Sequence, residues 1–191
     1  MAHCPQRRPS GDVLVGMVLT ALGRRDGLTR FGGTKDRFLA SLAPLIAFPL
    51  VAAFLAGLAG EARLASVQFL GTLCALLAPL VVSYELARLW GRVASWLRFA
   101  TAFNWCQWAI PLVAAVALAV LTPALRGPVG PYGAFAAGIG VAGLYALWLH
   151  WFIARHGLGI SVWRAILLVI CVNVASAVMG IGPALLAQRV L

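Results

Sequence analysis

Five long apolar runs dominate the sequence and leave few ways for the chain to fold. They cover residues 38–60, 64–87, 99–122, 131–154 and 162–186. Each run is near or above the ~20 residues that a helix needs to cross the hydrocarbon core of a bilayer. Backbone polar groups in lipid must be hydrogen-bonded within the segment, so each run is predicted to be a helix. The predicted fold is all-α, a polytopic membrane protein with a bundle of five transmembrane helices.

The composition supports this fold and excludes several others. Hydrophobic residues make up 62% of the chain and charged residues 10%, and the mean hydropathy is +0.95. Average soluble domains are about 45–50% apolar and about 25% charged, so the charges here are too few to coat a water-soluble surface. An outer-membrane β-barrel is also excluded, because its strands need alternating segments of about ten residues.

The positions of the basic residues predict the orientation. With a cytoplasmic N-terminus, twelve of the fifteen Lys and Arg residues fall on the cytoplasmic side, and only Arg63, Arg126 and Arg189 fall outside. This bias predicts that the N-terminus is inside and the C-terminus outside. The basic residues behind the net charge of +10 therefore indicate the orientation in the membrane, and they do not indicate a nucleic-acid partner. Lysine is almost absent beside abundant Arg, Ala and Gly, which favours a GC-rich bacterial source and an inner-membrane location.

Two regions are expected: a cytoplasmic basic segment at residues 1–37 and a transmembrane domain at residues 38–191. The basic segment holds seven Lys and Arg residues and a short apolar stretch at residues 12–23. That stretch either lies in the membrane interface, with its basic flank on anionic lipid, or packs on the cytoplasmic ends of the bundle. It is not a signal peptide, because Arg24, Arg25 and Asp26 follow it in place of a cleavage site.

Small residues line one face of the fourth predicted span. Ala134, Gly138 and Ala142 recur at intervals of four, a spacing that lets helix backbones approach closely. The partner is either another span of this chain or a second protomer, which would make a homo-oligomer. Prolines inside four of the spans predict kinks, which we interpret as ordinary bundle geometry: Pro44, Pro49, Pro79, Pro111 and Pro183.

A few polar residues interrupt the apolar runs and form the candidate site. They are Glu85, Asn104, Gln107, His150 and Asn173. All but Asn173 fall in the cytoplasmic half of the predicted bundle. One interpretation is a buried polar cluster that joins spans two, three and four. The other is that Glu85 pairs with Arg88 at the surface while His150 belongs to an interfacial aromatic belt.

Catalytic chemistry has little support in the sequence. The five acidic residues include no pair within one span, and no HExxH, GxSxG or phosphate-loop motif is present. His150 and His156 are six residues apart, which places them on poorly matched faces of a helix. We therefore expect no enzyme activity, no metal site and no cofactor.

Three short motifs carry a family resemblance. They are one stretch that runs from residues 27–31 (GLTRF) to 36–41 (DRFLAS), residues 103–105 (FNW) and residues 150–155 (HWFIAR). In these motifs the chain resembles small bacterial inner-membrane proteins distantly like the Yip (Ypt/Rab-interacting protein) family. The resemblance implies a cytoplasmic N-terminal region and five spans, and it assigns no catalytic or binding residues.

These observations lead to two functional hypotheses. The first is a non-enzymatic membrane protein that acts by association, as a scaffold or a subunit of a membrane complex. It rests on the small-residue face, the absence of catalytic sets and the Yip resemblance. The second is a small transporter or channel component that uses the cytoplasm-facing polar cluster. It rests on the five polar residues and on the prolines within the spans.

Overall fold

Helices make up every element in the part of the chain that the structure describes. The computed structural model describes the backbone of residues 9–189 and the side chains of residues 12–180. Residues 1–8 of the predicted basic segment and the side chain of Pro183 lie outside this description. The elements, where η1 is a 3-10 helix, are α1 (Pro9–Ala21), η1 (Arg25–Arg30), α2 (Lys35–Leu58), α3 (Ala62–Leu89), α4 (Val93–Cys106), α5 (Ala109–Gly157) and α6 (Val162–Arg189).

Four stretches within the described residues are long and apolar enough to cross a membrane. They are Lys35–Leu58, Ala62–Leu89, Val93–Gly157 and Val162–Gly180. Their outward faces carry large apolar side chains such as Phe54, which is 65% exposed. Such faces are typical of helices that lipid surrounds, because a water-soluble protein rarely exposes contiguous apolar surface on this scale.

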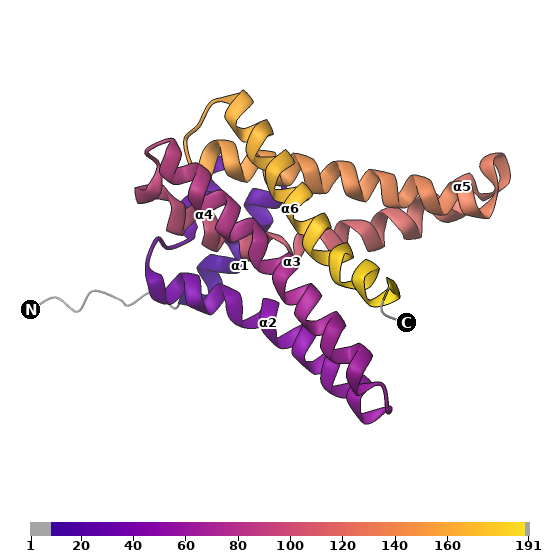
Figure 1. The fold of residues 1–191 in the computed structure, drawn as a ribbon. Coiled ribbons are helices and arrows are strands. Elements are labelled where there is room, and N and C mark those ends of the chain that lie inside the picture. Colours follow the sequence, from indigo (N-terminus) through magenta and orange to yellow (C-terminus); the bar gives the residue numbers. More distant parts are fainter. Residues whose placement is uncertain (1–8, 190–191) are drawn as a thin grey trace, which may run out of the picture.

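Helix α5 is a hairpin of two arms, residues 109–129 and 131–157. Gly130 has φ 73° and ψ 171°, a backbone conformation that glycine adopts far more readily than other residues. Pro128 and Pro131 flank it and lack the N–H groups that would continue the helical bonding. Figure 1 shows α5 running away from the rest of the molecule and returning beside itself. The second arm covers the predicted fourth run.

The predicted third run, residues 99–122, is not one helix and is corrected here. Helix α4 ends at Cys106 and α5 begins at Ala109. Pro111 explains the break, because it has no N–H to donate to the carbonyl of Gln107 four residues earlier. The N–H of Ile110 donates to that carbonyl instead, at 3.3 Å. Residues 99–106 belong to α4, and the rest of the predicted run lies in the first arm of α5.

Helix α1 packs on the end of the bundle and also keeps one apolar edge free. A Cβ atom on Gly27 would lie 2.7 Å from the Gly16 carbonyl oxygen. The backbones of α1 and η1 therefore approach closely where Gly16 and Gly27 meet. The Tyr145 hydroxyl of α5 donates to the carbonyl of Ala21 at 3.0 Å. Of the two predicted roles of residues 12–23, the structure shows the packing on the bundle, and the place in the membrane interface stays a prediction. The exposed edge consists of side chains four residues apart, Leu14, Val18 and Leu22.

The core lies where the helices converge. Buried side chains such as Phe99, Leu149 and Leu168 join α4, α5 and α6 there. Figure 1 shows α1 and α4 gathered at this end, from which the α2–α3 pair and the α5 hairpin diverge. Helix α6 contacts both α3 and α5. The divergence leaves unfilled space beside α6, and this space forms the candidate site.

Candidate functional site

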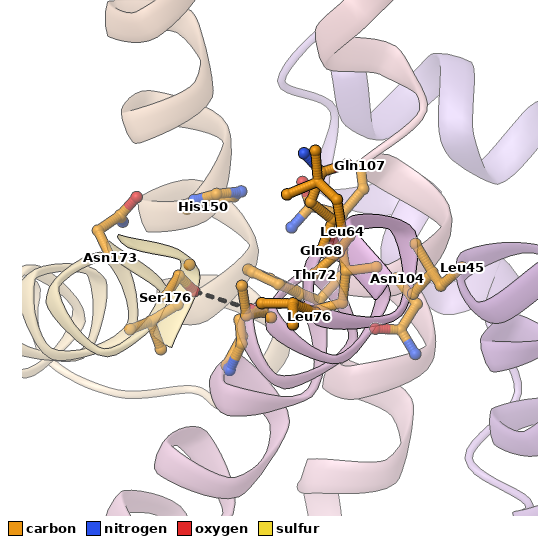
Figure 2. Close-up of a pocket in the computed structure, with 17 residues that line it drawn as sticks. Leu45, Leu64, Gln68, Thr72, Leu76, Asn104, Gln107, His150, Asn173 and Ser176 are labelled. Atoms are coloured by element: carbon orange, nitrogen blue, oxygen red, sulfur yellow. Dashed lines mark hydrogen bonds between the residues drawn. The ribbon is translucent and has the colours of Figure 1, made fainter. Parts of the chain in front are cut away.

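A pocket of about 790 Å³ lies among the diverging helices (Figure 2). Helix α3 supplies one long wall and α6 another, while α2, the α4–α5 junction and the second arm of α5 complete the lining. The volume falls within the range of about 300–1,000 Å³ that is usual for small-molecule sites. No Asp, Glu, Lys or Arg is among the lining residues.

The pocket brings together four of the five predicted polar residues. Asn104, Gln107, His150 and Asn173 all line it, and they come from α4, the α4–α5 junction, α5 and α6. The cluster is therefore formed by segments that are far apart in the sequence. Figure 2 shows His150 and Asn173 on neighbouring helices, with Gln107 across the pocket from them.

Glu85 does not belong to this cluster, which corrects the prediction. Its carboxylate lies 3.1 Å from the guanidinium of Arg88, one helical turn along α3, and both side chains are about half exposed. Residues three apart share a helix face, so the pair forms locally and directs the carboxylate away from the pocket. The surface pairing considered as the alternative is the one that the structure contains.

The helix break at Gln107 and Trp108 gives the pocket part of its wall. Gln107 lines the pocket, and the backbone at Gln107 and Trp108 keeps right-handed helical dihedral angles, so the interruption is one of hydrogen bonding. Irregular backbone at membrane depth is tolerated where protein buries it or where it lines a cavity.

Asn104 fixes the α4 side of the pocket to α2. Its side-chain amide, 2% exposed, donates to the Ser41 hydroxyl at 2.9 Å. The Ser41 hydroxyl in turn donates to the carbonyl of Phe38 at 2.6 Å. This chain of hydrogen bonds uses an amide hydrogen of Asn104 and leaves its carbonyl oxygen for other partners.

His150 contributes a polar ring that nothing around it satisfies. Both ring nitrogens are buried and have no hydrogen-bond partner among the described residues. The imidazole packs against the ring of Phe103, with centroids 4.7 Å apart. Buried polar groups are nearly always hydrogen-bonded in proteins, so this ring marks a place where a further partner would be favourable.

Three further polar residues of the pocket were missed in the sequence. Gln68 and Thr72 lie on α3, and Ser176 lies on α6. The Ser176 hydroxyl donates to the carbonyl of Ala75 at 3.1 Å and so ties α6 to α3. Gln68 and Thr72 are four residues apart in an otherwise apolar run, so they share a helix face. That spacing was the signal that could have found them.

The small-residue face is used inside this chain. Ala134, Gly138 and Ala142 are all buried. A Cβ atom on Gly138 would lie 2.7 Å from Cδ2 of Leu118, in the first arm of α5. Of the two partners left open by the sequence, the one seen here is another segment of the same chain.

Other site chemistry is sparse among residues 12–180. No group of three or more His, Cys, Asp or Glu side chains lies close enough to hold a metal ion there. Cys74, Cys106 and Cys171 are free thiols. No protein family model matches the chain, and no curated protein or solved structure is similar to it. The Yip resemblance stays a prediction.

Proposed function

We propose that this chain is a five-span membrane protein with a cytoplasmic N-terminus that binds a small molecule in its intramembrane pocket. Within the proposal it acts as a carrier or as the binding component of a transporter in a bacterial inner membrane. The reversal at Gly130 supports five spans, because it divides α5 into two arms that are each long enough to cross. The excess of basic residues in the N-terminal segment and in alternate loops supports the orientation.

The single observation that carries the function is the polar pocket beside a broken helix. Seven uncharged or imidazole side chains face it: Gln68, Thr72, Asn104, Gln107, His150, Asn173 and Ser176. Polar groups at membrane depth are costly, and they commonly mark substrate pathways.

Retention of a bound molecule tests this proposal. Thr72→Phe adds bulk to the pocket wall, while Leu70→Phe on the same helix adds the same ring at a position that is 59% exposed and outside the pocket. The two variants and the wild type are extracted gently, and everything that co-purifies is identified by mass spectrometry. We expect one class of molecule to be retained by the wild type and Leu70→Phe and lost from Thr72→Phe. Identical profiles for all three proteins contradict the proposal.

Association with other chains is the second candidate. The small-residue face no longer supports it, because Leu118 already covers Gly138. What favours it is an exposed apolar line on the first arm of α5, formed by Leu112, Val116 and Val120 at four-residue intervals. Light scattering after size-exclusion chromatography separates the two candidates. A defined complex that Val116→Trp disrupts would rank association first, and a monomer would leave the pocket as the functional feature.

A further inference from the structure

We infer that the pocket takes an uncharged amphiphile, a lipid-like molecule whose head carries hydroxyl or carbonyl groups and no net charge. This inference rests on the proposed function and names the ligand class for the same site. Three features of the pocket lead to it: the charges around it, the hydrogen-bonding groups that are still free, and its shape.

The charges exclude an ionic head group. The lining residues include no Asp, Glu, Lys or Arg that could neutralise one. The nearest predicted candidate, Glu85, is already paired with Arg88 outside the pocket. A charge that leaves water without a counter-charge is strongly disfavoured, so an anionic or cationic head would bind poorly here.

The free hydrogen-bonding groups suit a neutral head that both donates and accepts. Asn104 and Asn173 each use an amide hydrogen, on the Ser41 hydroxyl and the Val169 carbonyl, and keep their carbonyl oxygens. Gln107 makes no side-chain hydrogen bond among the described residues, and its amide offers both kinds of group. Both nitrogens of His150 are buried and unpartnered, so a hydroxyl or carbonyl beside them would gain a bond that nothing else supplies.

The shape of the pocket suits an extended apolar body. Its wall follows α3 from Leu64 to Pro79, about 22 Å of helix at 1.5 Å per residue. The apolar lining that would contact an acyl or isoprenoid chain consists of Leu45, Leu64, Val67, Leu76, Phe103 and Val172.

Three probes with identical chains separate the head-group classes. They are dioleoylglycerol, dioleoyl phosphatidic acid and dioleoyl trimethylammonium propane, which are neutral, anionic and cationic. Each is titrated into the full-length protein in detergent, and bound lipid is counted by native mass spectrometry. We expect dioleoylglycerol to bind at least about tenfold more tightly than either charged lipid. A tenfold ratio of the dissociation constants is the size that the loss of a few favourable contacts produces. Equal or tighter binding of a charged lipid overturns the inference.

Two near-isosteric variants test whether the lipid binds in the pocket. His150→Phe and Gln107→Leu each remove polar groups and keep most of the volume, and each is expected to weaken dioleoylglycerol binding about tenfold. His156→Phe is the matched control, since His156 lies on the same arm of α5, packs against Phe152 and does not line the pocket. If one variant fails to elute as a folded protein, the other carries the test. Unchanged binding in a folded variant contradicts the assigned site.

The outcome for the ligand class is separable from the outcome for the proposed function. If Thr72→Phe loses a retained molecule that proves to be ionic, the pocket binds a ligand and only the inferred class is wrong. If no molecule is lost from Thr72→Phe and no probe binds the wild type, the inferred ligand class and the proposed function are both wrong.

Discussion

Gly138 and Leu118 lie in direct contact across the α5 hairpin, with room for a hydrogen atom but not for a methyl group between them. A Cβ atom on Gly138 would lie 2.7 Å from the Leu118 side chain and 3.4 Å from its Cα. The two arms therefore touch at a position that suits glycine. This contact fixes how closely the hairpin closes, and it leads to the first prediction.

Gly138→Leu is expected to separate the arms of α5 and to destabilise the protein by about 1–3 kcal/mol, as overpacking of a buried position does. Gly140→Leu is the control, because a Cβ atom there meets nothing within 4 Å. The unfolding temperatures of the two variants are measured in detergent, with tryptophan fluorescence as the signal. Equal unfolding temperatures for the two variants would show that the contact contributes nothing.

Ser41→Ala removes the acceptor of a buried hydrogen bond. The Asn104 amide would then keep a buried donor without its partner, at a cost of about 1–3 kcal/mol. Ser66→Ala removes an exposed hydroxyl that bonds to the carbonyl of Ala62, and it should change stability by less than about 0.5 kcal/mol. The same unfolding assay compares the two. A larger effect at Ser66 than at Ser41 would be the contrary result.

Pro111→Ala restores the N–H that α5 lacks at its first turn. The carbonyl of Gln107 could then accept a regular helical bond, which would join α4 and α5 and turn Gln107 away from the pocket. We expect about tenfold weaker dioleoylglycerol binding, with stability unchanged or increased. Pro123→Ala in the same arm lies outside the pocket and serves as the control. Full binding by Pro111→Ala would show that the break does not position the site.

Glu85→Gln is expected to leave ligand binding unchanged. The carboxylate pairs with Arg88 at a half-exposed position and is absent from the pocket lining. Exposed ion pairs contribute about 0–1 kcal/mol, so the change in stability should stay within that range. Titration with dioleoylglycerol and thermal unfolding measure both quantities. A tenfold loss of binding would return Glu85 to the site.

Thiol labelling tests the proposed topology. In a variant with the native cysteines replaced, a cysteine at Gly127 should react with a membrane-impermeant maleimide added to intact cells. A cysteine at Arg92 should react only after the cells are opened. Both positions are exposed, so the difference reports the side of the membrane and not burial. Reaction at both positions from outside would contradict the five-span arrangement.

Apolar length along the chain was enough to predict α2 and α3. Predicted run 38–60 corresponds to α2 at Lys35–Leu58, and run 64–87 lies inside α3 at Ala62–Leu89. These predictions succeed because hydropathy and length are properties of a continuous segment. Hydropathy does not register a break two residues long, so run 99–122 was drawn across the junction at Gln107. Pro111 is visible in the sequence, but the place where the helical hydrogen bonding is interrupted is seen only in the folded chain.

Which polar residues share a site depends on how the helices pack against one another. Glu85 was the most conspicuous of them in the sequence because it is charged, yet its neighbour Arg88 satisfies it locally. Gln68 and Thr72 were inconspicuous, yet α3 packs so that their face lines the pocket. In the same way, the spacing of Gly138 predicted a close helix contact, and only the folded hairpin identified Leu118 as the partner. A residue's type and spacing fix what it can bind, whereas the rotation and packing of its helix fix what it meets.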